Sequence, residues 1–444
     1  MRRLVLVLLL FTAVIAHSNN GDWYQHFAAG EWYYAHGQVE RAETELKAAL
    51  RIANGFRPGD RRLERTLEDL GRLYEHQGQL DQAQSMYGLL VAAIEVRAGE
   101  DSPELLDALA ALGRVAVAAG DPATAEASFG RYAKLAAANP AADPDQHRLV
   151  LAALARMAVL DGHEGDALSY QRQAVALLDS GTADNAERAA MLETLAKLEL
   201  RHGSPEAGEQ LLIKAFKLVA KGDRPEDAAI VLARGAALAL GAGHPNIADQ
   251  LANRALASQP SEKAQLAARA TLADAAWLQM PHSDAGLVDL MGAGKGKPAV
   301  EEARRRLEEL AALQKRQLPP DDPALVQTRQ RLLRCAALAG DTDTVLTSLT
   351  QLIGEYRESG NTAAELRALQ DRAALLTTAG RSTQAVDANA ELLHRLENVR
   401  GASDQSLLPV LQRQYGLLRS LHRKKEARAI KKRLRRLERA LNRR

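Results

Sequence analysis

The run of glycines and lysines at 292–297, Gly-Ala-Gly-Lys-Gly-Lys, is the stretch most similar to a phosphate-binding loop. Such a loop requires a glycine, four residues and then Gly-Lys-Ser/Thr, and it lies between a strand and a helix. Met291 stands where the first glycine is needed, and Pro298 replaces the hydroxyl residue. The surrounding pattern predicts no strand. We therefore interpret the run as a flexible basic loop and not as a nucleotide site.

Histidines recur along the chain, but their spacing does not suit a metal ion. Neighbouring helices at normal packing distances would hold them roughly 10 Å apart. Ligands of one ion converge within about 4 Å of each other, because each metal–nitrogen distance is near 2 Å. We expect these histidines to complement the dipoles of helix C-termini instead. They are His36, His76, His163, His202 and His244.

No set of residues typical of a catalyst is present. The sequence has no Ser/His/Asp order, no cysteine pair and no His-Glu-x-x-His motif, and no acidic pair differs from ordinary helix-surface carboxylates. Cys335 is the single cysteine, so no intramolecular disulfide can form. It lies in an apolar helical pattern and is expected to pack as a small apolar residue. We predict a protein that is not an enzyme and that holds no metal or cofactor.

A repeated pair of helices is predicted to position the remaining side chains. A turn glycine recurs at intervals of 40 to 42 residues, a period typical of stacked helix pairs. A small residue stands seven positions before each turn glycine, where it lets the two helices of a pair approach closely. The turn glycines are Gly37, Gly78, Gly120, Gly162, Gly203 and Gly243, and the small residues are Gly30, Gly71, Gly113, Ala155, Ala196 and Ala236.

This pattern resembles the tetratricopeptide repeat, in which a first helix reads small-x-x-aromatic, glycine marks the turn, and alanine and an aromatic follow. Gly71, Tyr74, Gly78, Ala83 and Tyr87 match it. The period of 42 is similar to the extended variety found in kinesin light chains. The resemblance covers about 300 of the 444 residues. It implies an all-α fold, a right-handed superhelical solenoid of stacked antiparallel helix pairs.

The pattern predicts five segments. The segment at 261–320 is open to two interpretations, a hinge between two groups of repeats or a degenerate helix pair, and we favour the degenerate pair. The segments are a signal peptide at 1–16, six repeats at 22–260, a degenerate helical repeat with the basic loop at 261–320, two repeats at 321–403, and a terminal helix pair at 404–444 that ends in a basic amphipathic capping helix.

The N-terminal segment is typical of an export signal. Arg2 and Arg3 precede an apolar run from Leu4 to Ala16, which is too short for the roughly 30 Å hydrocarbon core of a membrane. Small residues at positions −3 and −1 predict cleavage after Ala16. An uncleaved anchor is the alternative. We expect an exported protein, periplasmic or secreted, that is soluble once the signal is removed.

The resemblance implies a concave groove lined by the residue that follows each small position. Four of these residues are cations, which we name the cation column. Glu68 and Glu193 stand four residues before two of them and are expected to pair within the helix. The other two, Arg114 and Arg156, have alanine there, so we hypothesise that they are the principal contacts for an extended acidic or carboxylate-ended peptide. A solvated column, or one paired between repeats, is the alternative. The cation column consists of Arg72, Arg114, Arg156 and Lys197.

Aromatic residues concentrate at the start of the first repeat. Tyr24, Phe27 and Tyr34 fall on groove positions, where they could anchor a partner, because aromatic residues often dominate binding energy. Capping of the open end of the array is the alternative role.

The C-terminal segment is strongly basic. Residues 419–444 carry 13 Lys and Arg against two Glu, although the whole chain has a net charge of only +2, so the rest of the chain is acidic. An apolar stripe at helical spacing is expected to dock this segment on the last repeat. Its cationic face could bind anionic lipid, a polyanion or the acidic body of a second copy. The exposed cations are predicted to be Lys424, Lys425, Arg428, Lys431, Lys432, Arg435 and Arg436.

These observations predict an exported, non-enzymatic scaffold for protein–protein interaction, whose groove binds an extended, acidic segment of another protein. The alternative is an envelope-associating protein whose basic C-terminal helix binds anionic lipid or polymer. Export disfavours nucleic acid as a partner, and self-association of the acidic body with the basic tail is a further hypothesis.

Overall fold

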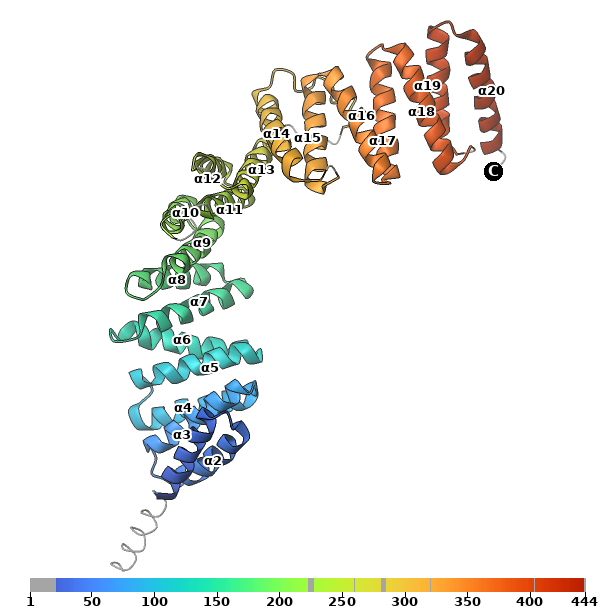
Figure 1. The fold of residues 1–444 in the computed structure, drawn as a ribbon. Helices are drawn as coiled ribbons and strands as arrows, with labels where there is room; N and C mark the ends of the chain where they lie inside the picture. The colour runs from blue at the N-terminus through green and yellow to red at the C-terminus, as the bar shows by residue number, and fades with distance from the viewer. Residues whose placement is uncertain are drawn as a thin grey trace, which may run out of the picture. The chain divides into compact units, whose positions relative to one another are not determined.

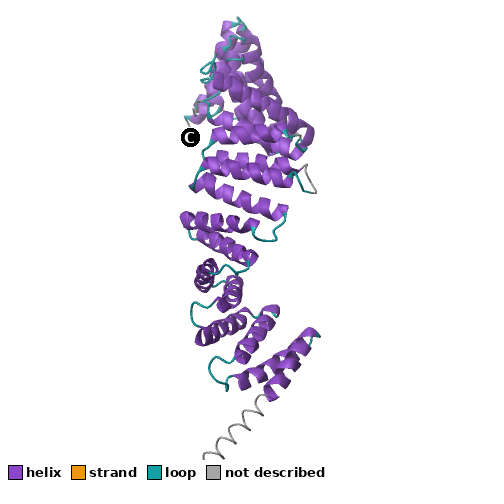
Figure 2. Cartoon of the chain, turned by 90° about the vertical axis from the view of Figure 1, so that its left-hand side faces the viewer, coloured by secondary structure: helices purple, strands orange, loops and turns teal. Residues whose placement is uncertain are grey.

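The computed structural model describes residues 21–222, 227–258, 260–280, 285–319, 321–402 and 404–442. All regular structure in these ranges is helical, and none of it is strand (Figure 2). The chain divides into two compact units, unit 1 at residues 1–225 and unit 2 at 226–444. The predicted all-α class is therefore confirmed. The predicted signal peptide at 1–16 lies outside the described residues.

Unit 1 begins with a helical segment at 21–35 and continues as antiparallel helix pairs (Figure 1). Side-chain caps define many of its helix starts. Asp121, for example, accepts a hydrogen bond from the backbone N–H of Thr124 at 3.1 Å, and Pro122 follows it at the first helical position. Its elements are α2 Val39–Ala53, α3 Arg61–His76, α4 Leu80–Ala98, η1 Pro103–Leu105, α5 Leu106–Ala119, α6 Pro122–Ala138, α7 Pro144–Leu160, α8 Glu164–Ala176, η2 Leu177–Asp179, α9 Asn185–His202 and α10 Pro205–Val219.

Unit 2 continues the same alternation of short turns and helices. Its core is one continuous cluster of alanine and leucine side chains that reaches from α13 to α20. Its helices are α11 Ala228–Gly241, α12 Pro245–Ala257, α13 Glu262–Leu278, α14 Pro298–Gln317, α15 Pro323–Ala339, α16 Thr342–Glu358, α17 Thr362–Thr378, α18 Ser382–Arg400, α19 Leu407–Ser420 and α20 Lys424–Leu441.

Small residues bring the two helices of a pair into close contact. In both units each helix packs mainly on its neighbours in the chain, as expected for a stacked array. A Cβ atom added to Gly71 would lie 2.8 Å from the ring of Tyr87, and one added to Gly113 would lie 2.5 Å from the ring of Phe129. Real Cβ atoms essentially never come within 3.0 Å of another heavy atom in this way. The small positions inferred from the sequence therefore serve close helix packing.

Most of the predicted turn glycines adopt the left-handed conformation that favours glycine. Gly120 ends α5 with a φ of 75° and donates to the last carbonyls of that helix. Gly203 is the exception, with a φ of −127°. Its turn is held by the buried carboxylate of Glu199, which accepts a 3.0 Å hydrogen bond from the backbone N–H of Ser204 and pairs with Arg172 at 2.7 Å.

The segment at 261–320 forms two helices, and its basic loop is tied to the fold. Helix α13 packs on α11, α12 and α14. In the loop, Gly292 and Gly294 donate backbone hydrogen bonds of 2.8 and 2.9 Å to the carbonyls of Ala337 and Leu338 near the end of α15. These two hydrogen bonds anchor the loop on α15, and its flexibility stays a prediction. The boundary between the compact units falls at 225/226 and not within this segment.

The basic terminal helix docks on α19 through the predicted stripe. Ala427 and Leu437 are buried, and Ile430, Leu434 and Leu441 pack against the unit 2 core. Among the described residues, no helix is both long and apolar enough to cross a membrane.

Candidate functional site

The cation column occupies one position on four successive first helices of unit 1. Arg72 lies on α3, Arg114 on α5, Arg156 on α7 and Lys197 on α9, and all four residues are exposed. The residues therefore repeat in the structure as they do in the sequence.

Two members of the cation column form ion pairs. Arg72 pairs with Glu68 one helical turn earlier. Arg114 pairs with Glu75 of α3, whose carboxylate also accepts a 3.2 Å hydrogen bond from the hydroxyl of Tyr87. The expectation that Arg114 lacks an acidic partner is wrong, because its partner comes from the preceding repeat and not from its own helix. The alternative of pairing between repeats applies to this residue.

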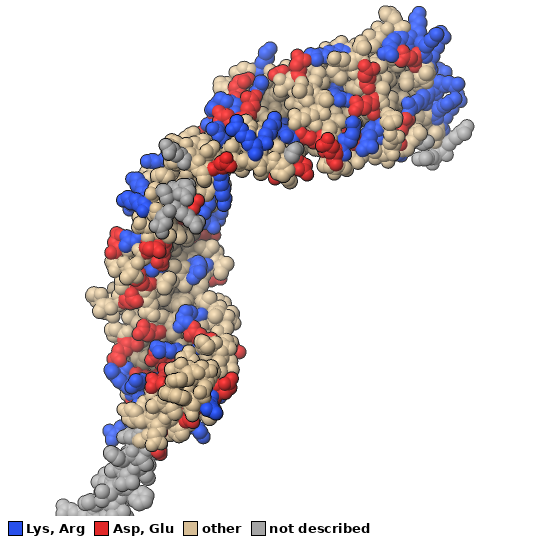
Figure 3. Space-filling view, viewed as in Figure 1, with Lys and Arg blue, Asp and Glu red and all other residues tan. Residues whose placement is uncertain are grey.

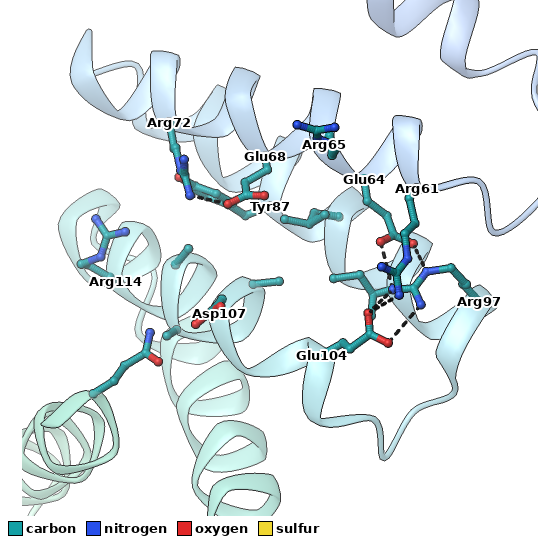
Figure 4. A pocket seen from close by; sticks show the side chains of 16 residues that line it. Arg61, Glu64, Arg65, Glu68, Arg72, Tyr87, Arg97, Glu104, Asp107 and Arg114 are labelled. Carbon is teal, nitrogen blue, oxygen red and sulfur yellow. Dashed lines mark hydrogen bonds and ion pairs between the residues drawn. The ribbon is translucent and has the colours of Figure 1, made fainter. Parts of the chain in front are cut away.

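Arg72 and Arg114 line a cavity of about 500 Å³ between α3, α4 and α5, which we name the unit 1 cavity (Figure 4). At its other end, Arg97 of α4 pairs with two carboxylates. Its guanidinium donates to Glu64 at 2.6 and 3.0 Å and to Glu104 at 2.7 and 3.1 Å. These hydrogen bonds from Arg97 hold the pKa of Glu104 below its usual value. The charged groups of this cavity thus largely neutralise one another.

Arg156 and Lys197 are the members of the cation column without such partners. Neither forms an ion pair or hydrogen bond with a residue that the structure describes. Exposed aliphatic residues lie three and four residues after Arg156 and seven before it, on the same face of α7. Leu160 is 85% exposed, and Leu149 and Val159 are about half exposed. Exposed aliphatic side chains gathered in this way are typical of an interaction surface.

The three aromatic residues predicted for the groove have different environments. Tyr24 is 60% exposed and Tyr34 is 38% exposed, and the ring of Tyr34 lies 6.0 Å from that of His76. Phe27 is 4% exposed and stacks on Trp23 with ring centroids 4.7 Å apart. The assignment of Phe27 to the groove is therefore corrected, since this residue belongs to the core.

Asp69 is a titratable residue that sequence reasoning missed. It lies half-buried on α3, beside the charges of Glu31, Glu68 and Arg72. Burial, with a smaller contribution from the negative charge of Glu31, raises the pKa of Asp69 to about 6. No signal in the sequence marks Asp69, because its burial depends on how the first helices of two repeats pack.

The basic face of α20 is exposed along the helix (Figure 3). Arg433 pairs with Glu397 of α18, and Arg423 pairs with Glu426 at 2.7 Å. The seven predicted cations form no ion pair with a described residue, although Lys431 lies 5.8 Å from the ring of Tyr415. These seven residues, exposed on one helix, are Lys424, Lys425, Arg428, Lys431, Lys432, Arg435 and Arg436.

The remaining candidate groups do not converge into a site. Among the described residues, no three His, Cys, Asp or Glu side chains are placed to hold a metal ion. Cys335 is fully buried, as predicted, with its Sγ 3.7 Å from the sulfur of Met280, and burial raises the pKa of its thiol to about 12. A thiol in this state is not a nucleophile at neutral pH.

Comparisons with known proteins match residues 62–138, from the start of α3 to the end of α6, to the tetratricopeptide repeat. No curated protein matches the chain. Among solved structures, a Podosopora anserina protein named as a kinesin light chain with nearly identical TPR-like repeats is 22% identical, with a TM-score of 0.37, over 45% of this chain and 96% of that chain. A tetratricopeptide repeat protein from Parabacteroides merdae is 14% identical, with a TM-score of 0.35, over 71% of this chain and 99% of that chain.

Proposed function

Residues 62–138 belong to the tetratricopeptide repeat family, and from this premise we propose that unit 1 binds an extended, acidic segment of a partner protein. The repeat fold suggests a scaffold for protein–protein interaction, and no described group of side chains has the arrangement of a catalyst. The finer assignment depends on the state of the cation column.

The observation that carries this proposal is the unpaired state of Arg156 within an exposed aliphatic surface. Arg72 and Arg114 already have carboxylate partners, so a ligand would have to displace Glu68 or Glu75 to reach them. Arg156 and Lys197 can donate hydrogen bonds to a ligand carboxylate without first losing a partner within the protein. Val159 and Leu160 offer apolar surface beside Arg156, and its burial would contribute about 25 cal/mol per Å².

The spacing of the column suggests the pattern of the ligand. We take the first helices of adjacent repeats to be spaced as packed helices are, roughly 10 Å apart, and an extended peptide advances about 3.3–3.6 Å per residue. Arg156 and Lys197 would therefore contact ligand residues about three positions apart. Since exposed ion pairs contribute little, contacts with Val159 and Leu160 beside Arg156 supply much of the affinity. The preferred segment has acidic residues separated by apolar ones.

Crosslinking mass spectrometry of the protein in its native compartment, followed by capture with variants, tests the proposal. Arg156→Glu with Lys197→Glu should abolish capture of the crosslinked partner and leave helicity unchanged. The matched control is Arg51→Glu with Lys134→Glu, which reverses two exposed cations elsewhere in unit 1. Capture that survives the first pair, or that is lost equally with the control pair, would contradict the groove assignment.

Export is part of the proposal and rests on the sequence of residues 1–16. Cleavage after Ala16 would leave His17 as the first residue. N-terminal peptide mapping of the protein from the periplasm or medium should find this end. An intact N-terminus in the membrane fraction would support the uncleaved anchor instead.

A second candidate function is attachment to an anionic envelope surface through α20. The observation that favours it is the row of exposed cations, which the docking of α20 on α19 leaves uncovered on one helix. Each Lys or Arg near an anionic lipid surface contributes about 1 kcal/mol. This role is compatible with partner binding in unit 1, because it uses other residues.

A further inference from the structure

The first and last described helices each have a face that no further repeat covers. The helical segment at 21–35 begins unit 1, and α20 ends unit 2 (Figure 1). Between them, the second helix of each repeat packs on the first helix of the next repeat, as α4 packs on α5 and α18 packs on α19. For the two end helices, such a neighbour would have to come from outside the described chain.

The uncovered face of segment 21–35 is the face that the following first helix buries. Trp32 is 53% exposed, whereas Leu73, at the same distance before the next turn glycine, is fully buried in α3. Gln25 is exposed too, but its counterpart Thr66 is fully buried and accepts a 3.1 Å hydrogen bond from the indole N–H of Trp23 in the preceding repeat. This face of a first helix therefore points toward the preceding repeat. We name it the N-terminal stripe, and it consists of Asp22, Gln25, Ala29 and Trp32, with Leu63, Thr66, Leu70 and Leu73 as the counterparts in α3.

Helix α20 has a corresponding face on its other side. The turns at Gly380 and His422 both have a positive φ, so each residue of α18 corresponds to the residue of α20 that lies 42 positions later. Val386 and Leu393 of α18 are buried, and Gln414 of α19 donates a 3.1 Å hydrogen bond to the carbonyl of Val386. The corresponding residues of α20 are exposed, and three of the four are cations. We name them the C-terminal stripe, which consists of Arg428, Lys431, Arg435 and Glu438, with Val386, Asn389, Leu393 and Leu396 as the counterparts in α18.

Contacts inside the array show which positions of the two stripes would meet. Gln414 stands eight residues before its turn residue and contacts Val386, which stands six residues after its own. Gln171 of α8, nine residues after its turn glycine, donates a 3.3 Å hydrogen bond to the carbonyl of Met191, twelve residues before the next one. The two helices of such a contact are thus antiparallel. The corresponding pairs between α20 and segment 21–35 are Arg428 with Ala29 beside Trp32, Lys431 with Gln25, and Arg435 with Asp22.

The two stripes are complementary in charge. Segment 21–35 contains the carboxylates of Asp22 and Glu31 and no Lys or Arg. Asp22 is exposed and forms no ion pair with a described residue, and the same holds for the cations of the C-terminal stripe. Arg428 would lie beside the ring of Trp32, and a guanidinium near an aromatic ring is attracted to it. A basic helix therefore suits the N-terminal stripe better than a neutral or acidic one.

We propose that α20 of one copy docks on segment 21–35 of a second copy, as a second helix packs on the next first helix within the chain. This contact joins two different surfaces, so it can repeat into open chains and does not close as a symmetric dimer. It uses no residue of the cation column and does not depend on partner binding in unit 1. It shares α20 with the proposed attachment to an envelope surface, and the experiment separates these two roles.

Sedimentation velocity of residues 17–444, the chain that cleavage after Ala16 leaves, tests the contact at low ionic strength. The sedimentation coefficient should rise with protein concentration. Asp22→Arg and Arg435→Asp should each raise Kd for self-association at least about tenfold, because each variant places like charges opposite each other. An equimolar mixture of the two variants should associate again, since the reversed charge of each one faces an opposite charge on the other. Trp32→Ala should also raise Kd, because it removes the ring beside Arg428.

The matched controls reverse one exposed carboxylate and one exposed cation on other helices. Glu126→Arg on α6 and Arg316→Asp on α14 should leave Kd unchanged, and all variants should keep the helical circular dichroism of the original chain. If the controls weaken association equally, it depends on net charge and the proposed contact is wrong.

Other results would also overturn the proposal. A sedimentation coefficient that does not rise with concentration would show that the two ends do not join copies. Two variants that stay monomeric when mixed would show that Asp22 and Arg435 do not face each other. Binding of phosphatidylglycerol vesicles through α20, by a protein that does not self-associate, would assign the C-terminal stripe to a membrane surface instead.

Discussion

Gly113 lies on α5 at a point where this helix packs closely against α6. A Cβ added there would lie 2.5 Å from the ring of Phe129, which is itself buried. Gly113→Ala is therefore expected to destabilise unit 1 by about 1–3 kcal/mol through overpacking. The measurement is the free energy of unfolding in urea.

Gly130 of α6 provides the control within the same helix pair. A Cβ added to it meets no atom within 4 Å, and its φ is not positive. Gly130→Ala should be neutral or should stabilise by up to about 1 kcal/mol, since alanine favours a helix interior more than glycine does. If both variants changed stability equally, the cost at Gly113 would not come from its contact with Phe129.

Asp69 is expected to make stability depend on pH. Its pKa of about 6 is above the ordinary value of 3.8, so the folded chain binds this proton more tightly than the unfolded chain. The free energy of unfolding should therefore fall as pH rises from about 4 to 6. Asp69→Asn should stabilise the protein by on the order of 1–3 kcal/mol at about pH 7 and much less at about pH 4. Urea unfolding at both pH values checks this, and equal stabilisation at the two would contradict it.

The residues that the sequence predicted correctly are those defined by local spacing. Gly71 and Gly113 follow from the period, because close helix packing is the same in each repeat. The partner of Arg114 could not be predicted in this way, since Glu75 is supplied by another repeat and only the stacking distance brings the two together. Phe27 was misassigned for a similar reason. The register placed it on the groove side, but packing against Trp23 buries it.

Helix α20 is the element whose two faces have separate roles. Its apolar stripe contacts α19, whereas its cations point away from the core. Lys431→Glu, Lys432→Glu and Arg435→Glu together should keep helicity and reduce binding to phosphatidylglycerol vesicles at least about a hundredfold, at roughly 1 kcal/mol per charge. Sedimentation with vesicles at low ionic strength measures this.

The control for α20 reverses three exposed cations on other helices of unit 2. Lys263→Glu, Lys315→Glu and Arg316→Glu change the net charge equally but leave α20 intact. If this control also loses vesicle binding, the attraction depends on net charge alone and α20 is not a specific attachment surface.

The elements themselves were more predictable than their connections. Helix α19 and helix α20 lie where the apolar period placed them. The loop at 292–297 was expected to be flexible because its composition is rich in glycine and lysine. Its hydrogen bonds to Ala337 and Leu338 could not be predicted, since they join segments more than 40 residues apart.

At the scale of the molecule, each unit has its own core. The buried cluster that includes Trp23 and Tyr87 lies within unit 1, and the cluster that extends to Leu437 lies within unit 2. In a repeat array, stability is approximately a sum over repeats and their neighbouring interfaces. Fragments 17–222 and 227–444 should therefore each fold, with the helical circular dichroism of the two fragments adding to that of the whole chain. A fragment that is unfolded alone would show that its unit depends on the other.

The two units also differ in how far their charged side chains are paired. The unit 1 cavity is largely neutralised by its own carboxylates, whereas the seven exposed cations of α20 form no ion pair with a described residue. Binding of an anionic partner by α20 should accordingly weaken as the salt concentration rises. Association of the basic tail of one copy with the acidic body of a second copy stays a prediction.

The turn at Gly203 has a consequence for how the chain is degraded. It is held by the carboxylate of Glu199, whose pKa is kept below its usual value mainly by the hydrogen bonds from Arg172. Its stabilising effect is present above the ordinary pKa of a glutamate and is lost as pH falls through the lowered one. The turns on either side of it, at Gly162 and Gly243, use a left-handed glycine instead. Farther along the chain, the turns at Gly120 and Gly340 share the acid dependence, because the capping carboxylates of Asp121 and Asp341 also have lowered pKa values. In strong acid, the α9–α10 connection should open before its neighbours, and an acid protease should make its first cut there.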